Sequence, residues 1–496
     1  MQLSESAFQL FAIILYFLAM IAIGFYAYRR IHNLNDYMLG GRSLGPAVSA
    51  LSAGAADMSQ WLLMGLPGAI YVAGLVEWWI AIGLTIGAWL NWKIVAPRLR
   101  VYTQISNDSI TIPSFFDNRF KENAKILRIV SGIIILVYFT FYVSSGFVAS
   151  GVFFESSFGY SYHLGLFIVG AVIILYTLVG GFLAVSYTDF VQGTIMFLAL
   201  ISLPIMGVFT TGGLSETIGA VKDFNPNWLS LTATATVSGV ISSLAWGLGY
   251  FGQPHIIVRF MAIRTAKETK QARRIGIGWM ILTLAGAAAT AFVGVAYFQQ
   301  NTGVELSDPE AVFIQMGQIL FHPFIAGILL AAVLAAIMST VSSQLIVTSS
   351  ALVEDIYKAI YKADASEKRY ILLGRIAVLV VSIVALILAW EKTNTILHLV
   401  AFAWAGFGAA FGPIILLSLY WKRFTSHGAL AGMIVGAVTV FIWGNTALGD
   451  YLYEIVPGFL LNFIVAVMVS KLTYKPIPKV EKEFDETLKL LKEEME

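Results

Sequence analysis

The fold is decided by one short stretch of sequence, Ala53-Gly54-Ala55-Ala56-Asp57-Met58-Ser59-Gln60-Trp61. It lies inside an apolar segment that runs from roughly Leu44 to Ala73, and about 20 apolar residues are enough to cross a bilayer. The segment carries one carboxylate, Asp57, and a cluster that we expect to break the helix, Gly65-Leu66-Pro67-Gly68. A charge at the bilayer centre costs roughly 2.5–3.5 kcal/mol, so it usually has a partner, a water-filled cavity or an ion. Pairing with a neighbouring helix, without any role in transport, is the alternative for Asp57.

The composition is that of a polytopic membrane protein. Of the 496 residues, 58% are hydrophobic and only 12% are charged, and the mean hydropathy is +0.79. The absence of cysteine excludes disulfides and thiolate metal sites. The first apolar run, about 22 residues from Ala7 to Tyr28, is long enough to span a bilayer. It lacks a basic region and a small-residue cleavage site, which indicates a retained helix rather than a signal peptide.

Thirteen apolar segments are predicted from length and flanking charge. Because this number is odd, the two ends of the chain lie on opposite sides of the membrane. With this assignment, all of the 31 Lys and Arg residues except Lys222 and Lys392 fall on one side. Arg259 is counted there, in the loop after the seventh segment. The positive-inside rule makes the charged side cytoplasmic, with the N-terminus outside and the C-terminus inside. The segments are centred near Ala19, Met58, Gly87, Tyr138, Val172, Phe197, Ala245, Gly286, Leu334, Val380, Phe407, Gly436 and Phe463.

Two of these segments are interrupted by glycine and proline. The second contains Gly65–Gly68, and the seventh contains Trp246–Pro254, five segments later. Paired interruptions in corresponding halves point to an inverted-repeat transporter whose binding sites lie at the breaks. We therefore predict an all-α membrane protein with thirteen transmembrane helices and a five-plus-five core of helices 2–6 and 7–11. The parts are residues 1–43 (first helix and loop), 44–210 (first repeat), 211–424 (outer loop and second repeat), 425–474 (helices 12 and 13) and 475–496 (a helical cytoplasmic tail).

Other motifs argue against an enzyme. Gly247-x-Gly249-x-x-Gly252 has the letters of a dinucleotide fingerprint, but no strand precedes it and it lies in a membrane segment. No Gly-x4-Gly-Lys-Ser/Thr loop occurs, which argues against ATP-driven pumping. The histidines show no metal-binding spacing, and no Ser/His/Asp constellation is recognisable. We expect no nucleic-acid partner and no obligatory protein partner. Gly428-x3-Gly432-x3-Gly436 is instead typical of close helix packing.

Two groups of side chains are candidates for binding. In one interpretation, the hydroxyls of the ninth segment donate hydrogen bonds to backbone carbonyls of their own helix. The other is that they join freed carbonyls near Ala55 and Met58 around a hard cation, which needs several oxygen ligands. Aromatic residues of the fourth and seventh segments either pack against neighbouring helices or line a substrate pocket. Such a pocket would bind a small apolar ring with a cationic amine. The N-terminus of a half-helix would bind the carboxylate of the same molecule. The hydroxyls are Ser339, Thr340, Ser342 and Ser343, and the aromatic residues are Tyr142, Trp246 and Tyr250.

Six blocks of sequence carry a family resemblance: Leu39–Pro46, Ser52–Ser59, Trp61–Ala69, Gly180–Asp189, Gly247–His255 and Ala335–Thr340. They closely resemble the bacterial sodium/proline symporters of the sodium/solute symporter family. The match runs along nearly the whole chain and fades only near Asn301 and in the tail. The resemblance implies thirteen helices around a five-plus-five core, in a multi-pass protein of the cell membrane. It further implies that sodium drives the import of L-proline.

The resemblance also implies roles for individual residues. Asp57 matches the acidic residue that the family requires for sodium, Arg42 a position tied to coupling, and Asp189 one on an ion exit route. Ser342 and Ser343, with Asp189, resemble a second sodium site of some relatives. Gln60 departs from the family pattern, which has glycine there, and this change affects affinity or specificity. The implied sodium ligands are the carbonyls of Ala55, Met58 and Ala336 and the hydroxyls of Ser339 and Thr340, and the implied proline contacts are Tyr142, Trp246, Tyr250 and Pro254.

The sequence thus predicts a secondary transporter that couples inward sodium flow to L-proline uptake by alternating access. One charge is worth about 2.3 kcal/mol per 100 mV, and a tenfold sodium gradient adds about 1.4 kcal/mol. Together these support roughly 500-fold accumulation of a net-neutral amino acid with a single ion. The alternatives are another small solute such as pantothenate, a proton in place of sodium, and passive facilitation.

Overall fold

The computed structural model describes residues 2–361 and 364–496. Lys362, which the sequence places in the loop after the ninth segment, lies outside the described residues. Every regular element in the described part of the chain is a helix, which confirms that the protein is all-α. Outside the helices, a single parallel bridge joins Leu44 to Ile263 among these residues.

The helices of the N-terminal half, with η marking 3-10 or π turns, are α1 (Gln2–Tyr28), α2 (Leu34–Leu39), η1 (Gly40–Arg42), α3 (Pro46–Asp57), η2 (Trp61–Gly65), α4 (Leu66–Ala73), η3 (Leu75–Glu77), α5 (Trp78–Leu90), η4 (Asn91–Val95), α6 (Ala96–Ile105), α7 (Ile112–Phe120), α8 (Ala124–Phe158), α9 (Tyr162–Thr210), α10 (Leu214–Phe224) and α11 (Val237–Leu244). The remaining helices are η5 (Ala245–Gly252), α12 (Pro254–Ala262), α13 (Thr269–Gln300), η6 (Pro309–Ala311), α14 (Val312–Leu320), α15 (Pro323–Ser350), η7 (Ala351–Tyr357), α16 (Lys358–Tyr361), α17 (Glu367–Leu388), α18 (Ile396–Tyr420), α19 (Ser426–Gly444), α20 (Leu448–Tyr451), α21 (Ile455–Thr473) and α22 (Pro478–Met495).

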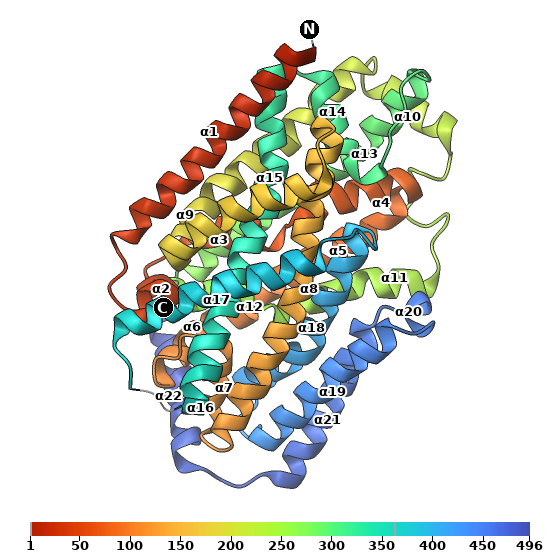
Figure 1. The fold of residues 1–496 in the computed structure, drawn as a ribbon. Coiled ribbons are helices and arrows are strands. Elements are labelled where there is room, and N and C mark those ends of the chain that lie inside the picture. Colours follow the sequence, from red (N-terminus) through yellow and green to blue (C-terminus); the bar gives the residue numbers. More distant parts are fainter. Residues whose placement is uncertain (1, 362–363) are drawn as a thin grey trace.

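Helix α15 forms the centre of the bundle. Every residue from Leu329 to Ser350 is buried, as expected for a helix that is surrounded by other helices on all sides. It packs against α1, α3, α8 and α9. Figure 1 shows α1 along one edge of the molecule and the α19–α21 pair along the opposite edge. The candidate ligands Ser339 and Thr340 are therefore held in the most enclosed part of the fold.

Ten helices in the described part of the chain are long and apolar enough to cross a membrane. One of them, α9, is 49 residues long and covers two of the segments predicted from the sequence. The two meet at Gly181, whose dihedrals (φ 57°, ψ −148°) are not helical. A side chain there would lie 2.6 Å from the ring of Tyr37, so both the backbone and the space require glycine. The two interrupted segments are absent from the ten because each consists of shorter pieces.

The second segment is broken, but not where the sequence analysis placed the break. Helix α3 ends at Asp57, the chain leaves the helix at Met58 (φ −75°, ψ 72°), and helical structure resumes in η2. The predicted breaker, Gly65–Gly68, lies inside the continuous helical run of η2 and α4, so that part of the prediction was wrong. Pro67 is the second residue of α4 and follows the π-helix η2, and this local change of helix type accommodates a residue that lacks a backbone N–H.

The seventh segment is broken at the predicted place. It consists of α11, the 3-10 turns of η5, one extended residue at Gln253, and α12. The glycines that mimic a dinucleotide fingerprint allow close packing of this irregular part. An added Cβ would lie 2.2 Å from the Gly83 carbonyl at Gly247 and 1.9 Å from the Trp404 ring nitrogen at Gly249.

The glycines of the Gly428-x3-Gly432-x3-Gly436 motif lie where α19 meets α18 and α21. An added Cβ would lie 2.4 Å from Asn462 Oδ1 at Gly432 and 2.2 Å from the Ala409 carbonyl at Gly436. The predicted close packing is thus confirmed, and it makes the motif a determinant of stability.

We expect Gly436→Ala to lower the stability of the folded protein by about 1–3 kcal/mol, because the methyl group overfills this contact. The apparent unfolding temperature of the purified protein in detergent measures the effect. Gly278→Ala in α13 is the matched control, since a Cβ there meets no atom within 4 Å. A fall in the control as large as that in Gly436→Ala would contradict the packing argument.

Candidate functional site

The end of α3 lies against the middle of α15. The Ser339 hydroxyl donates to the Ala55 carbonyl over 2.8 Å, and the Thr340 hydroxyl lies 3.5 Å from the same oxygen. Ser339 Oγ also lies 3.3 Å from the Ala336 carbonyl. Residues more than 280 positions apart in sequence are thus joined at a helix break, and oxygen atoms from both helices converge there.

Met58 is the residue at which α3 stops. Its N–H donates to the Gly54 carbonyl over 2.7 Å, while its own ψ of 72° turns the following chain away from the helix axis. The carbonyl end of a helix carries a partial negative charge. Ala55 and Met58 therefore lie at an end of α3 that favours a cation.

Asp57 is buried beside this break. Its Oδ2 accepts a hydrogen bond from the Tyr250 hydroxyl, whereas its Oδ1 has no protein partner among the described residues. A cavity of about 20 Å³ is lined by both residues and by Asn91 and Met58, which is room for about one water molecule. The Asp57–Tyr250 contact ties the break in the second segment directly to the irregular part of the seventh.

Aromatic rings surround Tyr250. Tyr250 and Trp404 form a T-shaped pair with ring centroids 5.0 Å apart and an interplanar angle of 88°. The Trp404 ring nitrogen donates to the Trp246 carbonyl over 2.8 Å. Trp246 stacks on Tyr453 with centroids 5.3 Å apart and an angle of 4°. Trp404 and Tyr453 were missed by the sequence analysis, since their only signal is that they are aromatic.

The remaining candidate contacts lie on the other side of the same region. Tyr142 of α8 is buried, and its ring lies 5.7 Å from that of His255. The Gln60 amide donates to Ser145 Oγ over 2.9 Å, and Ser145 Oγ donates to the Tyr142 carbonyl over 2.6 Å. Gln60 is therefore anchored on α8 beside Tyr142. Pro254 opens α12 next to His255.

The Asp189 carboxylate forms an ion pair with the guanidinium of Arg259. Arg259 Nη2 donates to Asp189 Oδ2 over 2.9 Å and to Ser343 Oγ over 2.7 Å, and the Ser52 hydroxyl donates to the same carboxylate over 2.8 Å. Both side chains of the ion pair are 0% exposed. The prediction that Arg259 is a loop charge was wrong, because α12 continues to Ala262. The Ser342 hydroxyl donates to the Ser339 carbonyl over 3.2 Å.

Arg42 lies apart from the breaks. Its guanidinium pairs with Asp108 at 2.9 Å and donates to the carbonyls of Met261 and Ser109, each over 2.7 Å. Burial lowers the pKa of Arg42, and Asp108 opposes this shift. Arg42 therefore joins the end of α12 to the loop between α6 and α7, and touches no candidate ligand of the break.

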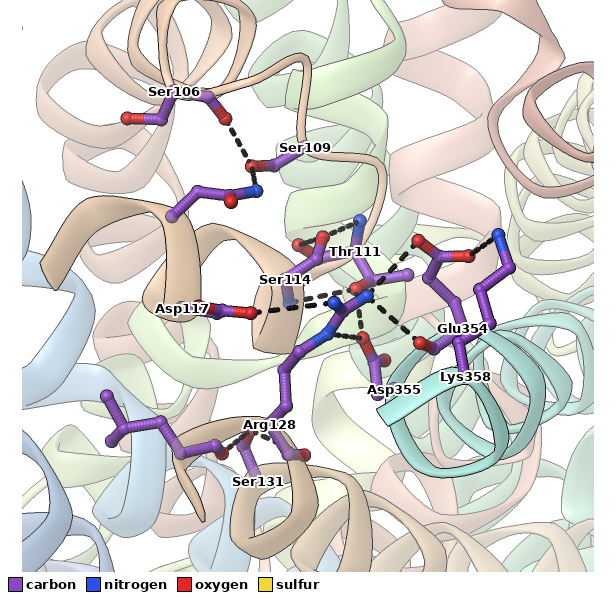
Figure 2. A network of polar contacts seen from close by, with 12 residues as sticks. Ser106, Ser109, Thr111, Ser114, Asp117, Arg128, Ser131, Glu354, Asp355 and Lys358 are labelled. Carbon is purple, nitrogen blue, oxygen red and sulfur yellow. Dashed lines mark hydrogen bonds and ion pairs between the residues drawn. The ribbon is translucent and has the colours of Figure 1, made fainter. Parts of the chain in front are cut away.

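A second polar network was not predicted from the sequence. Figure 2 shows Arg128 of α8 facing carboxylates from α7 and η7: Asp117 and Asp355 at 3.5 Å and Glu354 at 3.1 Å. Thr111 Oγ1 donates to Asp355 over 2.7 Å. Asp355 lines a small cavity that also reaches Pro254, while Arg128 and Glu354 line a polar cavity of about 380 Å³. Residues of the network thus line both cavities.

Comparison with known proteins gives close relatives. The high-affinity proline transporter PutP of Bacillus subtilis is 61% identical over 467 residues, covering 94% of this chain and 98% of the relative. The osmoregulated proline transporter OpuE of the same organism is 54% identical, covering 96% and 97%. Sodium/proline symporter 2 of Staphylococcus saprophyticus is 51% identical, covering 97% and 96%.

Solved structures share the fold at low sequence identity. A sodium-coupled sialic acid symporter in a substrate-bound outward-open state has a TM-score of 0.81 at 20% identity, covering 95% of this chain and 98% of its own. The nucleobase-cation-symport transporter Mhp1 in a closed conformation has a TM-score of 0.55 at 13% identity, covering 91% and 98%. The pattern of the Sodium:solute symporter family matches residues 37–436. The chain belongs to the sodium:solute symporter family.

Proposed function

We propose that this protein is a sodium-coupled symporter that imports L-proline by alternating access. The observation that carries the proposal is the meeting of the Ala55 carbonyl with the Ser339 and Thr340 hydroxyls at a broken helix. Relatives that match nearly the whole chain are described as proline transporters and as a sodium/proline symporter. Both lines of support point to transport rather than to catalysis.

The proposed sodium ligands are the carbonyls of Ala55, Met58 and Ala336 and the hydroxyls of Ser339 and Thr340. A hard cation is bound by several oxygen atoms, and sodium would replace the direct contact of Ser339 with Ala55. In this proposal Asp57 acts through its charge, since it follows Ala55 by two residues at the negative end of α3. The second sodium site at Ser342, Ser343 and Asp189 is not proposed, because Arg259 already donates to two of these residues.

The proposed substrate contacts are Tyr142, Trp246, Tyr250, Pro254 and Gln60. Aromatic rings attract a cationic amine and pack against an apolar ring. Coupling would run through Tyr250, whose hydroxyl binds Asp57 while its ring packs on Trp404. If sodium orders the break that holds Asp57, sodium and proline raise each other's affinity by the same factor.

The proposed topology has thirteen membrane crossings in the cell membrane, with the N-terminus outside and the C-terminus inside. It is supported by the division of α9 at Gly181 and by the two segments that are broken rather than absent. Residues 44–210 and 211–424 would form the inverted repeats, between an N-terminal part (1–43), a helical pair (425–474) and a tail (475–496). Arg42 and the Arg128 network would hold the cytoplasmic side closed, and Asp189 would lie on the ion exit route.

Purified protein in liposomes tests this function. We expect uptake of labelled L-proline against its gradient with sodium outside, and at most about a tenth of that rate with protons alone, because neutral carbonyl and hydroxyl oxygens bind a hard metal cation. Pantothenate should not compete at tenfold excess. Equal uptake without any ion gradient would indicate a facilitator, and uptake driven by protons would transfer the coupling role to Asp57 itself.

A further inference from the structure

His255 occupies a position that the proposed substrate contacts do not explain. It is the second residue of α12, its side chain is 0% exposed, and neither ring nitrogen has a hydrogen-bond partner among the described residues. A neutral imidazole carries one N–H donor and one acceptor. Buried polar groups in native proteins are almost always hydrogen-bonded, so an unpaired ring indicates a partner that is not protein.

His255 has further polar groups without hydrogen bonds in its neighbourhood. Tyr142 and Phe139 of α8 each pack against the imidazole with interplanar angles of 74°, at centroid distances of 5.7 and 5.4 Å. Gln60 Oε1 and the Tyr142 hydroxyl are also buried without a hydrogen bond in the described part of the chain, and the Tyr142 hydroxyl faces Ser59. Gln60 is linked to Tyr142 through Ser145. Unpaired polar groups from α12, α8 and the broken second segment therefore gather around Tyr142.

The backbone beside His255 favours an anion. No side chain caps the first turn of α12, and the Gln253 carbonyl accepts from the N–H groups of Ile256 and Ile257. At the other half-helix the Ser59 side chain accepts from the Trp61 N–H over 3.4 Å. The N-terminus of a helix carries a partial positive charge, and that of α12 has no side-chain cap.

The two breaks thus present opposite polarities. The carbonyl end of α3 carries Asp57, and the amide end of α12 carries His255. A zwitterion between them would be oriented with its ammonium group toward Asp57 and its carboxylate toward α12.

We propose that His255 is a specificity-determining residue, which donates its ring N–H to the carboxylate of the amino-acid substrate at the N-terminal end of α12, whose partial positive charge attracts the same group. The Tyr142 hydroxyl is the neighbouring donor. This assignment rests on the proposed function, and it restricts the substrate to compact molecules with a free carboxylate. In this arrangement the aromatic side chains contact the ring of proline. His255 therefore discriminates between substrates by the charge of the carboxylate rather than by the shape of the molecule.

Binding to the purified full-length protein at saturating sodium tests the proposal. Displacement of labelled L-proline is measured with L-proline and with L-prolinamide, which has the same ring and no carboxylate. A hydrogen bond to a charged group corresponds to about 10- to 100-fold in affinity. We expect His255→Leu to lower the affinity for L-proline by that factor and the affinity for L-prolinamide by less than about twofold. His255→Gln, which keeps an N–H donor, should fall between His255→Leu and the wild type.

If His255 had a merely structural role, its substitution would also change sodium binding in the absence of proline. We expect the sodium affinity of both variants to stay within about twofold of the wild type. His163→Leu is the matched control, because His163 packs on Trp390 with centroids 4.1 Å apart, away from both breaks. Equal losses for the two ligands, or unchanged proline affinity, would overturn the assignment. If the wild-type protein binds no proline in sodium, the proposed function fails first and the role of His255 fails with it.

Discussion

Asp57→Asn is expected to abolish sodium-driven proline uptake while the protein still folds. The asparagine side chain has nearly the same shape and keeps an oxygen that can accept from the Tyr250 hydroxyl. The substitution removes the negative charge at the C-terminal end of α3, beside the Ala55 carbonyl that is a proposed sodium ligand. Loss of one charge near a bound cation should weaken sodium binding by at least about 100-fold, or about 2.7 kcal/mol. The measurement is sodium-dependent stabilisation of the purified variant, alongside uptake in liposomes.

Tyr250→Phe is the companion variant that separates the two ligands. It keeps the charge of Asp57 and the aromatic ring that packs on Trp404, and it removes only the hydroxyl. We expect its sodium affinity to change less than tenfold, whereas its apparent proline affinity falls further. Normal sodium affinity in Asp57→Asn would contradict the role given to the carboxylate. A shared loss of folded protein in both variants would instead indicate that the Asp57–Tyr250 contact is structural.

The sequence was sufficient to place the two breaks in the right segments and to predict that hydroxyls of α15 lie beside the Ala55 carbonyl. Length and apolarity define a membrane span, and glycine and proline mark where a helix is weakened. The position of the first break was wrong because those rules are local. Pro67 fits the first turn of α4, while the chain actually leaves the helix at Met58, where no glycine or proline marks it.

Partners across the bundle could not be predicted in the same way. Arg259 and Asp189 are 70 residues apart, and a count of positive charges assigns an arginine near a segment end to a loop. Only the three-dimensional packing shows that Arg259 lies inside the protein. Trp404 and Tyr453 were missed for a related reason, since a membrane protein with 14% aromatic residues has many rings and no spacing rule that connects them.

The second large effect is expected at this buried ion pair. Arg259→Gln should lower the stability of the folded protein by about 3–5 kcal/mol, because it leaves the Asp189 carboxylate buried without a countercharge. The double variant Arg259→Gln/Asp189→Asn should recover most of this loss, since both charges are then absent. The unfolding temperatures of the four proteins in the cycle measure the coupling between the two side chains.

Ser343→Ala provides the matched control for that cycle. It removes one acceptor from Arg259 but leaves the ion pair intact, so its effect should be limited to about 1.5–3 kcal/mol, the range for a hydrogen bond to a charged group. If the guanidinium instead stands in for a second sodium ion, Arg259→Gln should gain stability with added sodium, whereas the double variant should not. No recovery in the double variant would mean that Arg259 is held by its carbonyl contact with His255 rather than by Asp189, and that the charge of Asp189 is free to serve the ion pathway.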